Sequence, residues 1–387
     1  MGKSWKNWKL CLASQIDICG DDGMGYIALG DLISKALVEK CGKREYPVLS
    51  MTMHDGIVFQ NDRFKKDIAS IDRSNYSIVG FNQLVVSFPI DEGVLAVQDI
   101  TDAGIVSPAY KIWDIDQAKL VPKYLEMWLR SPRSIDYYKS KLRGTTARRR
   151  SIPEEDFLGM RVNVPPKEEQ GRIVNLLTRV KGVILLREQQ LSALDDLIKA
   201  RFVERFGDPV SNPKGWDRVR FDTICENLDS RRVPITSTDR ISGVYPYYGA
   251  SGIVDYVDDY IFDEDILLIS EDGANLVMRT TPIAFSVSGK VWVNNHAHVV
   301  RFKEMATQKY IEVAFSVIDI SEHITGSAQP KFNQAKLNAM MFNNPPLELQ
   351  KQFAAFVAQI DKSKSAIQKS LDETQLLFDS LIQKYFG

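Results

Sequence analysis

One segment of this chain occurs twice. RVNVPPKEEQGRIVNLL occupies 161–177, and MFNNPPLELQKQFAAFV occupies 341–357, 180 residues later. Shorter matches flank both copies, namely KYLE at 123–126 with KYIE at 309–312, and Phe-Gly at 206–207 with Phe-Gly at 386–387. A repeat of this extent predicts a fold made of two similar halves. One core is therefore not expected to account for all 387 residues.

A long helix is predicted after each Pro-Pro pair. Proline fits the first turn of a helix, and Glu168 and Glu348 suit its positive end. Apolar residues then recur in alternating steps of four and three over about four heptads, which is a coiled-coil pattern. The predicted seam is Ile173, Leu177, Val180, Ile184, Leu191, Leu194 and Ile198, with Phe353, Val357, Ile360, Ile367, Leu371, Phe378 and Leu381. Arg187, Lys364 and Thr374 interrupt it.

The repeat also predicts the domain organisation. The expected segments are a first globular domain at 1–164, a helix at 165–206, a second globular domain at 207–344 and a helix at 345–387. Because domain termini usually lie close together, the second helix should run back along the first. The expected fold class is α+β, with two similar α/β domains, an antiparallel two-helix coiled coil of about 58 Å and approximate two-fold symmetry. The alternative is two amphipathic helices, each packed on its own domain.

Composition excludes several classes of protein. The chain is 44% hydrophobic and 26% charged, and no apolar run approaches the ~20 residues of a membrane span. The N-terminal segment MGKSWKNWKL has no apolar signal region, so a cytoplasmic location is expected. The four cysteines form no Cys-x-x-Cys pair, which favours reduced thiols over a zinc site.

Positive charge is concentrated in 123–151, although the formal net charge is only -1. This stretch has nine Lys or Arg residues against two acids, a pattern expected where phosphates bind. Arginine can contact guanine or phosphate, and threonine can add hydroxyl contacts. The candidate DNA-binding residues here are Arg143, Thr145, Thr146, Arg148, Arg149 and Arg150. A solvated run of charges is the alternative.

Two similar, non-identical domains on a fixed spacer suit the reading of two different short DNA sequences separated by a gap. Apart from the repeated segments the two domains share little sequence, so the two half-sites should differ. Two other interpretations stay open. One is a rigid spacer without a ligand, and the other is a coiled-coil scaffold that binds proteins and does not read DNA.

The chain resembles the DNA specificity (S) subunit of type I restriction-modification systems over essentially its whole length. The resemblance rests on VPPKEEQGRI and NPPLELQKQF, ARFVERFGDPVSNPKGW at 200–216, GIVSPAYKIWDI at 104–115, and the stretch from LLISEDGANL to HAHVVRF at 267–302. It implies two target-recognition domains joined by conserved helices. The second copy lacks the paired glutamates 168–169 of the first, which could weaken one partner contact.

The resemblance also implies partners and cofactors. The expected partners are double-stranded DNA, two adenine-N6 methyltransferase (M) subunits and, in the full complex, restriction (R) subunits. S-adenosylmethionine, ATP and Mg are expected in those subunits, and this chain is expected to bind no cofactor or metal and to be no enzyme.

The second domain has further candidate DNA-binding residues on polar, glycine-rich stretches expected to be loops. They are Arg231, Arg232, Tyr247, Tyr248, Ser251, Lys290, Asn294, Asn295 and Lys331. Tyrosine, asparagine and lysine can approach bases and backbone there, but the two tyrosines could equally be core aromatics.

Three catalytic interpretations are disfavoured by particular residues. Asn-Pro-Pro at 344–346 is followed by Leu347, whereas an amino-methyltransferase needs an aromatic residue to stack on a flipped base. Gly249 begins a Gly-x-Ser-x-Gly pattern that fails at Ile253, so a serine hydrolase is not indicated. His296 and His298 could face the same way on a strand, but no carboxylate or cysteine cluster completes a metal site.

Overall fold

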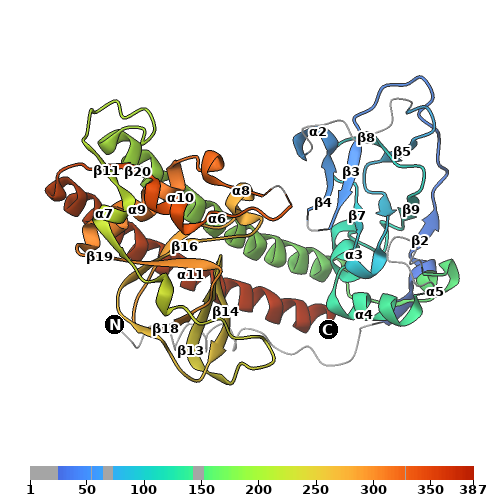
Figure 1. Cartoon of the computed structure of the whole chain (residues 1–387). Coiled ribbons are helices and arrows are strands. Elements are labelled where there is room, and N and C mark those ends of the chain that lie inside the picture. The colour runs from blue at the N-terminus through green and yellow to red at the C-terminus, as the bar shows by residue number, and fades with distance from the viewer. Residues whose placement is uncertain (1–24, 54, 64–72, 143–151, 327) are drawn as a thin grey trace. The chain divides into compact units, whose positions relative to one another are not determined.

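The computed structural model describes residues 25–53, 55–63, 73–142, 152–326 and 328–387 (Figure 1). Contacts divide the chain into two units. Unit 1 comprises 1–185 and 373–387, and unit 2 comprises 186–372. Each unit therefore combines a globular part with portions of both long helices.

The two long helices are α6 (Lys167–Phe206) and α11 (Leu347–Phe386), each of 40 residues. In unit 1 the beginning of α6 shares a core with the end of α11, and in unit 2 the end of α6 shares a core with the beginning of α11. The helices are therefore antiparallel within each unit, and the predicted fold class is confirmed in this respect. Every residue of the predicted seam is buried or half-buried.

Unit 1 is built around a four-stranded antiparallel sheet of order β2-β9-β6-β7, with three two-stranded ladders, β1-β10, β3-β4 and β5-β8. Its strands are β1 (Gly25–Ala28), β2 (Ile33–Lys35), β3 (Leu49–Thr52), β4 (Gly56–Phe59), β5 (Ser77–Gly80), β6 (Leu84–Val86), β7 (Leu95–Val97), β8 (Ala103–Val106), β9 (Lys111–Ile115) and β10 (Arg161–Val164). Its shorter helices are α2 (Gln60–Arg63), α3 (Pro122–Leu129), α4 (Pro132–Lys141) and α5 (Glu154–Leu158).

Unit 2 has two four-stranded sheets, β12-β19-β16-β17 and β14-β13-β18-β15, and the ladder β11-β20. Its strands are β11 (Arg218–Arg220), β12 (Cys225–Asn227), β13 (Ser242–Gly249), β14 (Gly252–Val257), β15 (Phe262–Asp263), β16 (Ile266–Ser270), β17 (Ala284–Val287), β18 (Lys290–Val293), β19 (Ala297–Phe302) and β20 (Met341–Asn343). Its shorter helices are α7 (Phe221–Ile224), α8 (Asn275–Met278), α9 (Met305–Val317) and α10 (Gln334–Ala339).

The repeated segments form the same joint in both units. Each begins with a strand, β10 or β20, that pairs antiparallel with the first described strand of its globular part, β1 or β11. The hydroxyl of Tyr124 donates to the carbonyl oxygen of Asn163 at 3.0 Å, and Tyr310 donates to Asn343 at the same distance. The repeat thus specifies how a globular part is attached to the beginning of a long helix.

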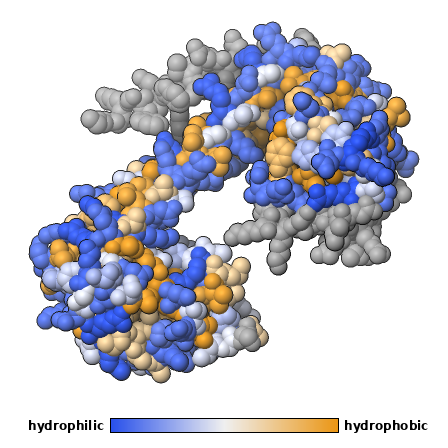
Figure 2. Space-filling model, turned by 90° about the horizontal axis from the view of Figure 1, so that it is seen from above, coloured by the Kyte–Doolittle hydropathy of each residue, from blue (hydrophilic) through white to orange (hydrophobic). Residues whose placement is uncertain are grey.

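Some apolar side chains of the long helices remain exposed, and hydrophobic residues reach the surface in Figure 2. In unit 1 they are Leu176, Val183, Leu185, Leu376 and Leu377. They lie outside the predicted seam, so pairing of the two helices does not bury them.

Candidate nucleic-acid interface

The described cations of the basic segment in unit 1 have partners. Lys123 contacts Asp99 at 3.0 Å and Glu126 at 3.1 Å. The other contacts are Arg130 with Glu126, Lys139 with Asp136, Lys141 with Asp156, and Arg133 with the carbonyl oxygen of Gly387. Asp99 and Asp156, which lie outside the basic segment, therefore offset part of the charge that the sequence concentrates here. Arg143, Thr145, Thr146, Arg148, Arg149 and Arg150 lie outside the described residues.

Unit 2 contains a hollow of about 650 Å³ where several polar loops meet. It is lined by the turn after β13, the loop between β16 and α8, the loop between β18 and β19, and residues 234–236. Four of the predicted DNA-binding residues line it, namely Tyr247, Ser251, Asn294 and Asn295. The structure thus brings together stretches that lie up to about 60 residues apart in the sequence.

The lining residues differ in how free their side chains are. Tyr247 is only 1% exposed, and its hydroxyl accepts a hydrogen bond from the Ile235 N–H at 3.0 Å. Asn294 is buried and its Oδ1 accepts from the His296 N–H at 2.8 Å. Ser251 and Asn295 are exposed, with no described side-chain partner in unit 2. These last two can still bind another molecule.

The remaining candidates in unit 2 do not line the hollow. Arg231 pairs with Glu264 at 2.6 Å, and its guanidinium lies 4.5 Å from the centre of the Phe262 ring. The ammonium of Lys290 lies 4.6 Å from the centre of the Tyr260 ring. Tyr248 packs on Phe285, and Lys331 is exposed.

A cluster of four ionisable side chains lies next to the hollow, and we call it the ion cluster: Asp229, Arg232, Glu271 and His298. Arg232 pairs with Glu271 at 2.7 Å and with Asp229 at 3.5 Å. The Nδ1 of His298 lies 2.7 Å from Asp229 Oδ2, and its Nε2 lies 2.8 Å from the Phe332 carbonyl oxygen. Both neighbours are acceptors, so both ring nitrogens must carry hydrogens for both contacts to be hydrogen bonds.

These contacts bear on the two histidines considered as metal ligands. Both ring nitrogens of His298 are already engaged within the ion cluster, and His296 is paired with Asp272 at 2.9 Å. In the parts of the chain that the structure describes, no three His, Cys, Asp or Glu side chains are grouped so as to hold a metal ion. Burial raises the pKa of the Cys225 thiol to about 12.

The ion cluster predicts an acid-dependent stability. Burial alone would raise the pKa of Asp229, but the hydrogen bonds from His298 and the Val299 N–H outweigh it, and the pKa lies below its ordinary value of 3.8. The ionised carboxylate therefore stabilises unit 2 fully above pH 3.8, and this contribution is lost as the pH falls through the lowered value. Relative to wild type, Asp229→Asn should lower the thermal midpoint at pH 6 and lower it less at pH 3.

Thermal melts of both proteins across this pH range measure the difference. Asp258→Asn is the matched control, because Asp258 is exposed and forms no described side-chain ion pair. A gap between wild type and Asp229→Asn that stays constant from pH 6 to pH 3 would contradict the assignment.

A family model described as "Type I restriction modification DNA specificity domain" matches residues 213–374. This segment holds the hollow, the ion cluster and the second copy of the repeat. Residues 213–374 are a type I restriction-modification DNA specificity domain. The resemblance found in the sequence is thereby confirmed.

One relative is similar to this chain in sequence, and two solved structures are similar to it in fold. A type I restriction enzyme specificity subunit from Haemophilus influenzae is 34% identical over 129 residues, which span 33% of this chain and 33% of the relative. The S subunit of a type I restriction-modification system from M. genitalium has a TM-score of 0.58 at 14% identity, over 96% of this chain and 98% of that one. A chain from a study of complex assembly and conformational transition in the type I system has a TM-score of 0.54 at 15% identity, over 94% and 98%. The two structural likenesses show the fold.

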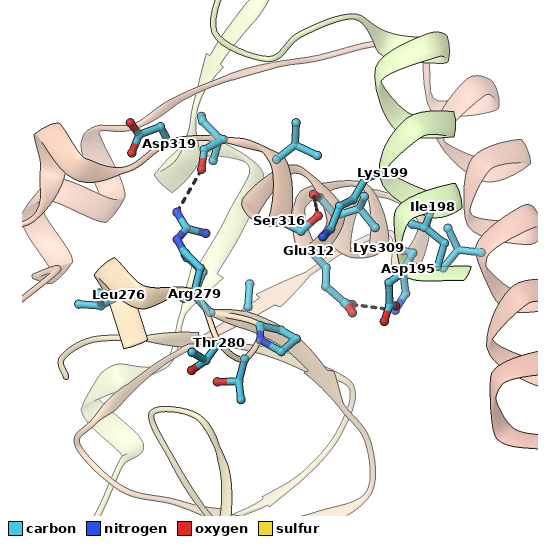
Figure 3. A pocket seen from close by; sticks show the side chains of 18 of the residues that line it. Asp195, Ile198, Lys199, Leu276, Arg279, Thr280, Lys309, Glu312, Ser316 and Asp319 are labelled. Atoms are coloured by element: carbon cyan, nitrogen blue, oxygen red, sulfur yellow. Dashed lines mark hydrogen bonds and ion pairs between the residues drawn. The ribbon is translucent and has the colours of Figure 1, made fainter. Parts of the chain in front are cut away.

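Unit 2 has a second hollow, of about 660 Å³, between α6, α9 and residues 276–284 (Figure 3). The guanidinium of Arg279 donates to the carbonyl oxygens of Phe315 at 2.8 Å and Ile318 at 3.1 Å, at the end of α9. Lys364 of α11 pairs with Asp195 of α6 at 2.5 Å. These polar groups join elements of unit 2 to one another.

Within the described residues, no helix has the length and apolar character needed to cross a membrane.

Sequence reasoning missed the acids of the ion cluster. Asp229 and Glu271 are 42 residues apart, and neither belongs to a recognisable motif. Asp229 directly precedes the Ser-Arg-Arg stretch singled out for DNA binding, but nothing local distinguishes an arginine that binds phosphate from one paired with a buried acid.

Proposed function

We propose that this chain is a DNA-reading specificity subunit of a type I restriction-modification complex, and that it recognises an asymmetric site in two parts. The observation that carries the proposal is the specificity-domain match at 213–374, in a chain whose repeated joint occurs in both units. One such joint serves one reading domain. Two joints with different loops therefore correspond to two half-sites of different sequence.

The second half-site is read by loops around the hollow of unit 2. Ser251 and Asn295 offer a hydroxyl and an amide there, the groups that hydrogen-bond to base edges in the major groove. Arg231, Lys290 and Lys331 are exposed on the same unit and provide contacts to phosphates. For unit 1 the proposal rests on the arginines and threonines of 143–150.

In this proposal the chain has no catalytic role of its own. Lys167 and Leu347 follow the two Pro-Pro pairs, where an amino-methyltransferase would need an aromatic residue. Methyl transfer belongs to two M subunits with S-adenosylmethionine, and ATP and Mg belong to R subunits. The exposed apolar side chains of α6 and α11 in unit 1 support docking of a partner protein. The proposed location of the complex is the cytoplasm.

A domain exchange tests this proposal. The chain and its M subunit are expressed in a host without other adenine methylation, and N6-methyladenine is mapped across the genome. Replacing 1–164 with the corresponding domain of another specificity subunit should change one half of the methylated motif and leave the other half and the gap unchanged. Alteration of both halves would refute separate reading by two domains. A wild-type chain without salt-dependent DNA binding would favour the scaffold interpretation instead.

A further inference from the structure

The side chain of Arg232 joins three separate segments of unit 2. Its Nε donates to the carbonyl oxygen of Asp229 at 3.1 Å, within its own segment. One terminal nitrogen donates to the Glu271 carboxylate at 2.7 Å, in the loop after β16. The same nitrogen contacts the carbonyl oxygen of Ala297, the first residue of β19, at 2.8 Å and that of Asn295, in the loop before β19, at 3.5 Å.

Arg232 is itself poorly placed to bind DNA. Its side chain is only 14% exposed, and its polar atoms face acceptors of the protein. The neighbouring Arg231 is 43% exposed. If the guanidinium turned toward a phosphate, it would lose its ion pairs with Asp229 and Glu271 in a partly buried site, which is costly.

The segments that Arg232 joins carry the walls of the hollow. The loop after β16 continues from Glu271 into Asp272 and Gly273, and the loop before β19 holds Asn294, Asn295 and His296. Asn295 is the lining residue whose backbone Arg232 contacts, and its side chain is exposed. The position of this free amide therefore depends on the contacts of Arg232.

We propose that Arg232 is a positioning residue that sets the Asn295 amide for contact with a base of the second half-site. The inference rests on the proposed function. An asparagine amide can donate to N7 and accept from N6 of adenine, so the base is an adenine. Such a contact needs both hydrogen bonds at once, which makes it sensitive to small shifts of the loop.

Lysine cannot replace arginine in this role. The guanidinium is planar and presents five donors in a fixed fork, which matches acceptors on three segments. An ammonium keeps the charge on a single nitrogen and cannot reach all of these acceptors together. Arg232→Lys should therefore keep the ion pair with an acid and release one or both loops.

The test compares Arg232→Lys with wild type in the complete complex with its M subunit. Genome-wide mapping of N6-methyladenine should show that Arg232→Lys relaxes the preference at one position of the second half-site by roughly tenfold to a hundredfold. The first half-site should be unchanged, and the salt dependence of DNA binding should keep its slope, because no phosphate contact is lost. Arg301→Lys is the matched control, since Arg301 forms exposed ion pairs with Glu226 and Glu264.

Two further variants keep the inference testable if Arg232→Lys does not fold. Asn295→Ala should relax the same position, and Glu271→Gln should relax it to a smaller extent with the fold retained. A uniform loss of methylation at unchanged preference would mean a structural role only, and a lower salt slope would mean direct phosphate binding; either result overturns the inference. A wild-type complex that methylates no bipartite motif would instead refute the proposed function.

Discussion

Replacing Phe353 with alanine is expected to lower the free energy of unfolding of unit 2 by about 3–5 kcal/mol. Phe353 is fully buried at the beginning of α11. Its ring centre lies 5.3 Å from that of Phe206 and 5.7 Å from that of Phe202, at the end of α6. Alanine would leave a cavity where the two helices and the globular part of unit 2 meet, and the surrounding rings could fill it only in part.

The loss is measured by denaturant unfolding of the full chain. Hydrogen exchange, resolved on peptides of each unit, monitors the unfolding and gives the stability of unit 2 separately. Leu186→Ala is the matched control, because Leu186 is a helical apolar residue of unit 2 that is 59% exposed, and its change should stay within about 0.5 kcal/mol. If the Phe353 variant were as stable as this control, the aromatic cluster of Phe202, Phe206 and Phe353 would not stabilise unit 2.

Replacing Arg148, Arg149 and Arg150 together with alanine is expected to weaken DNA binding strongly and to reduce its salt dependence. If all three contact phosphates, the slope of log affinity against log salt should become shallower by about three. Binding measured between 50 and 200 mM salt, roughly the range in which such slopes are determined, tests this.

The triple change to lysine is the control for the arginine run. It keeps the three charges, so the slope should persist, while any two-pronged contact with guanine is lost. An unchanged slope in the alanine variant would mean that this run is only a solvated stretch of charge.

The long helices were predictable because their information is local. The apolar residues of the seam recur in steps of three and four, and the Pro-Pro pairs mark where each helix begins. The antiparallel packing followed from the repeat, which required the chain to return from the second globular part. In unit 1, Ile173 of α6 shares a core with Leu381 of α11, and in unit 2, Ile198 of α6 shares a core with Val357 of α11. Both pairings agree with antiparallel helices.

The details around the hollow were not predictable in the same way. Arg232 was selected because it lies in a basic, loop-like stretch, yet Glu271 and Ala297, which engage it, are 39 and 65 residues away. Tyr247 was left open between base contact and core; it is buried, and its hydroxyl accepts a hydrogen bond from the N–H of Ile235, 12 residues away. Long-range pairs of this kind leave no periodic signature in the sequence.

The division of the long helices has a consequence for synthesis. Unit 2 is one uninterrupted stretch, 186–372, whereas the core of unit 1 includes Leu381 and Phe386 from the last turns of α11. Translation proceeds from the N-terminus, and domains generally fold as units. The ribosome therefore releases all the residues of unit 2 before it supplies the final side chains of unit 1, so the half that is made first is the half that is completed last.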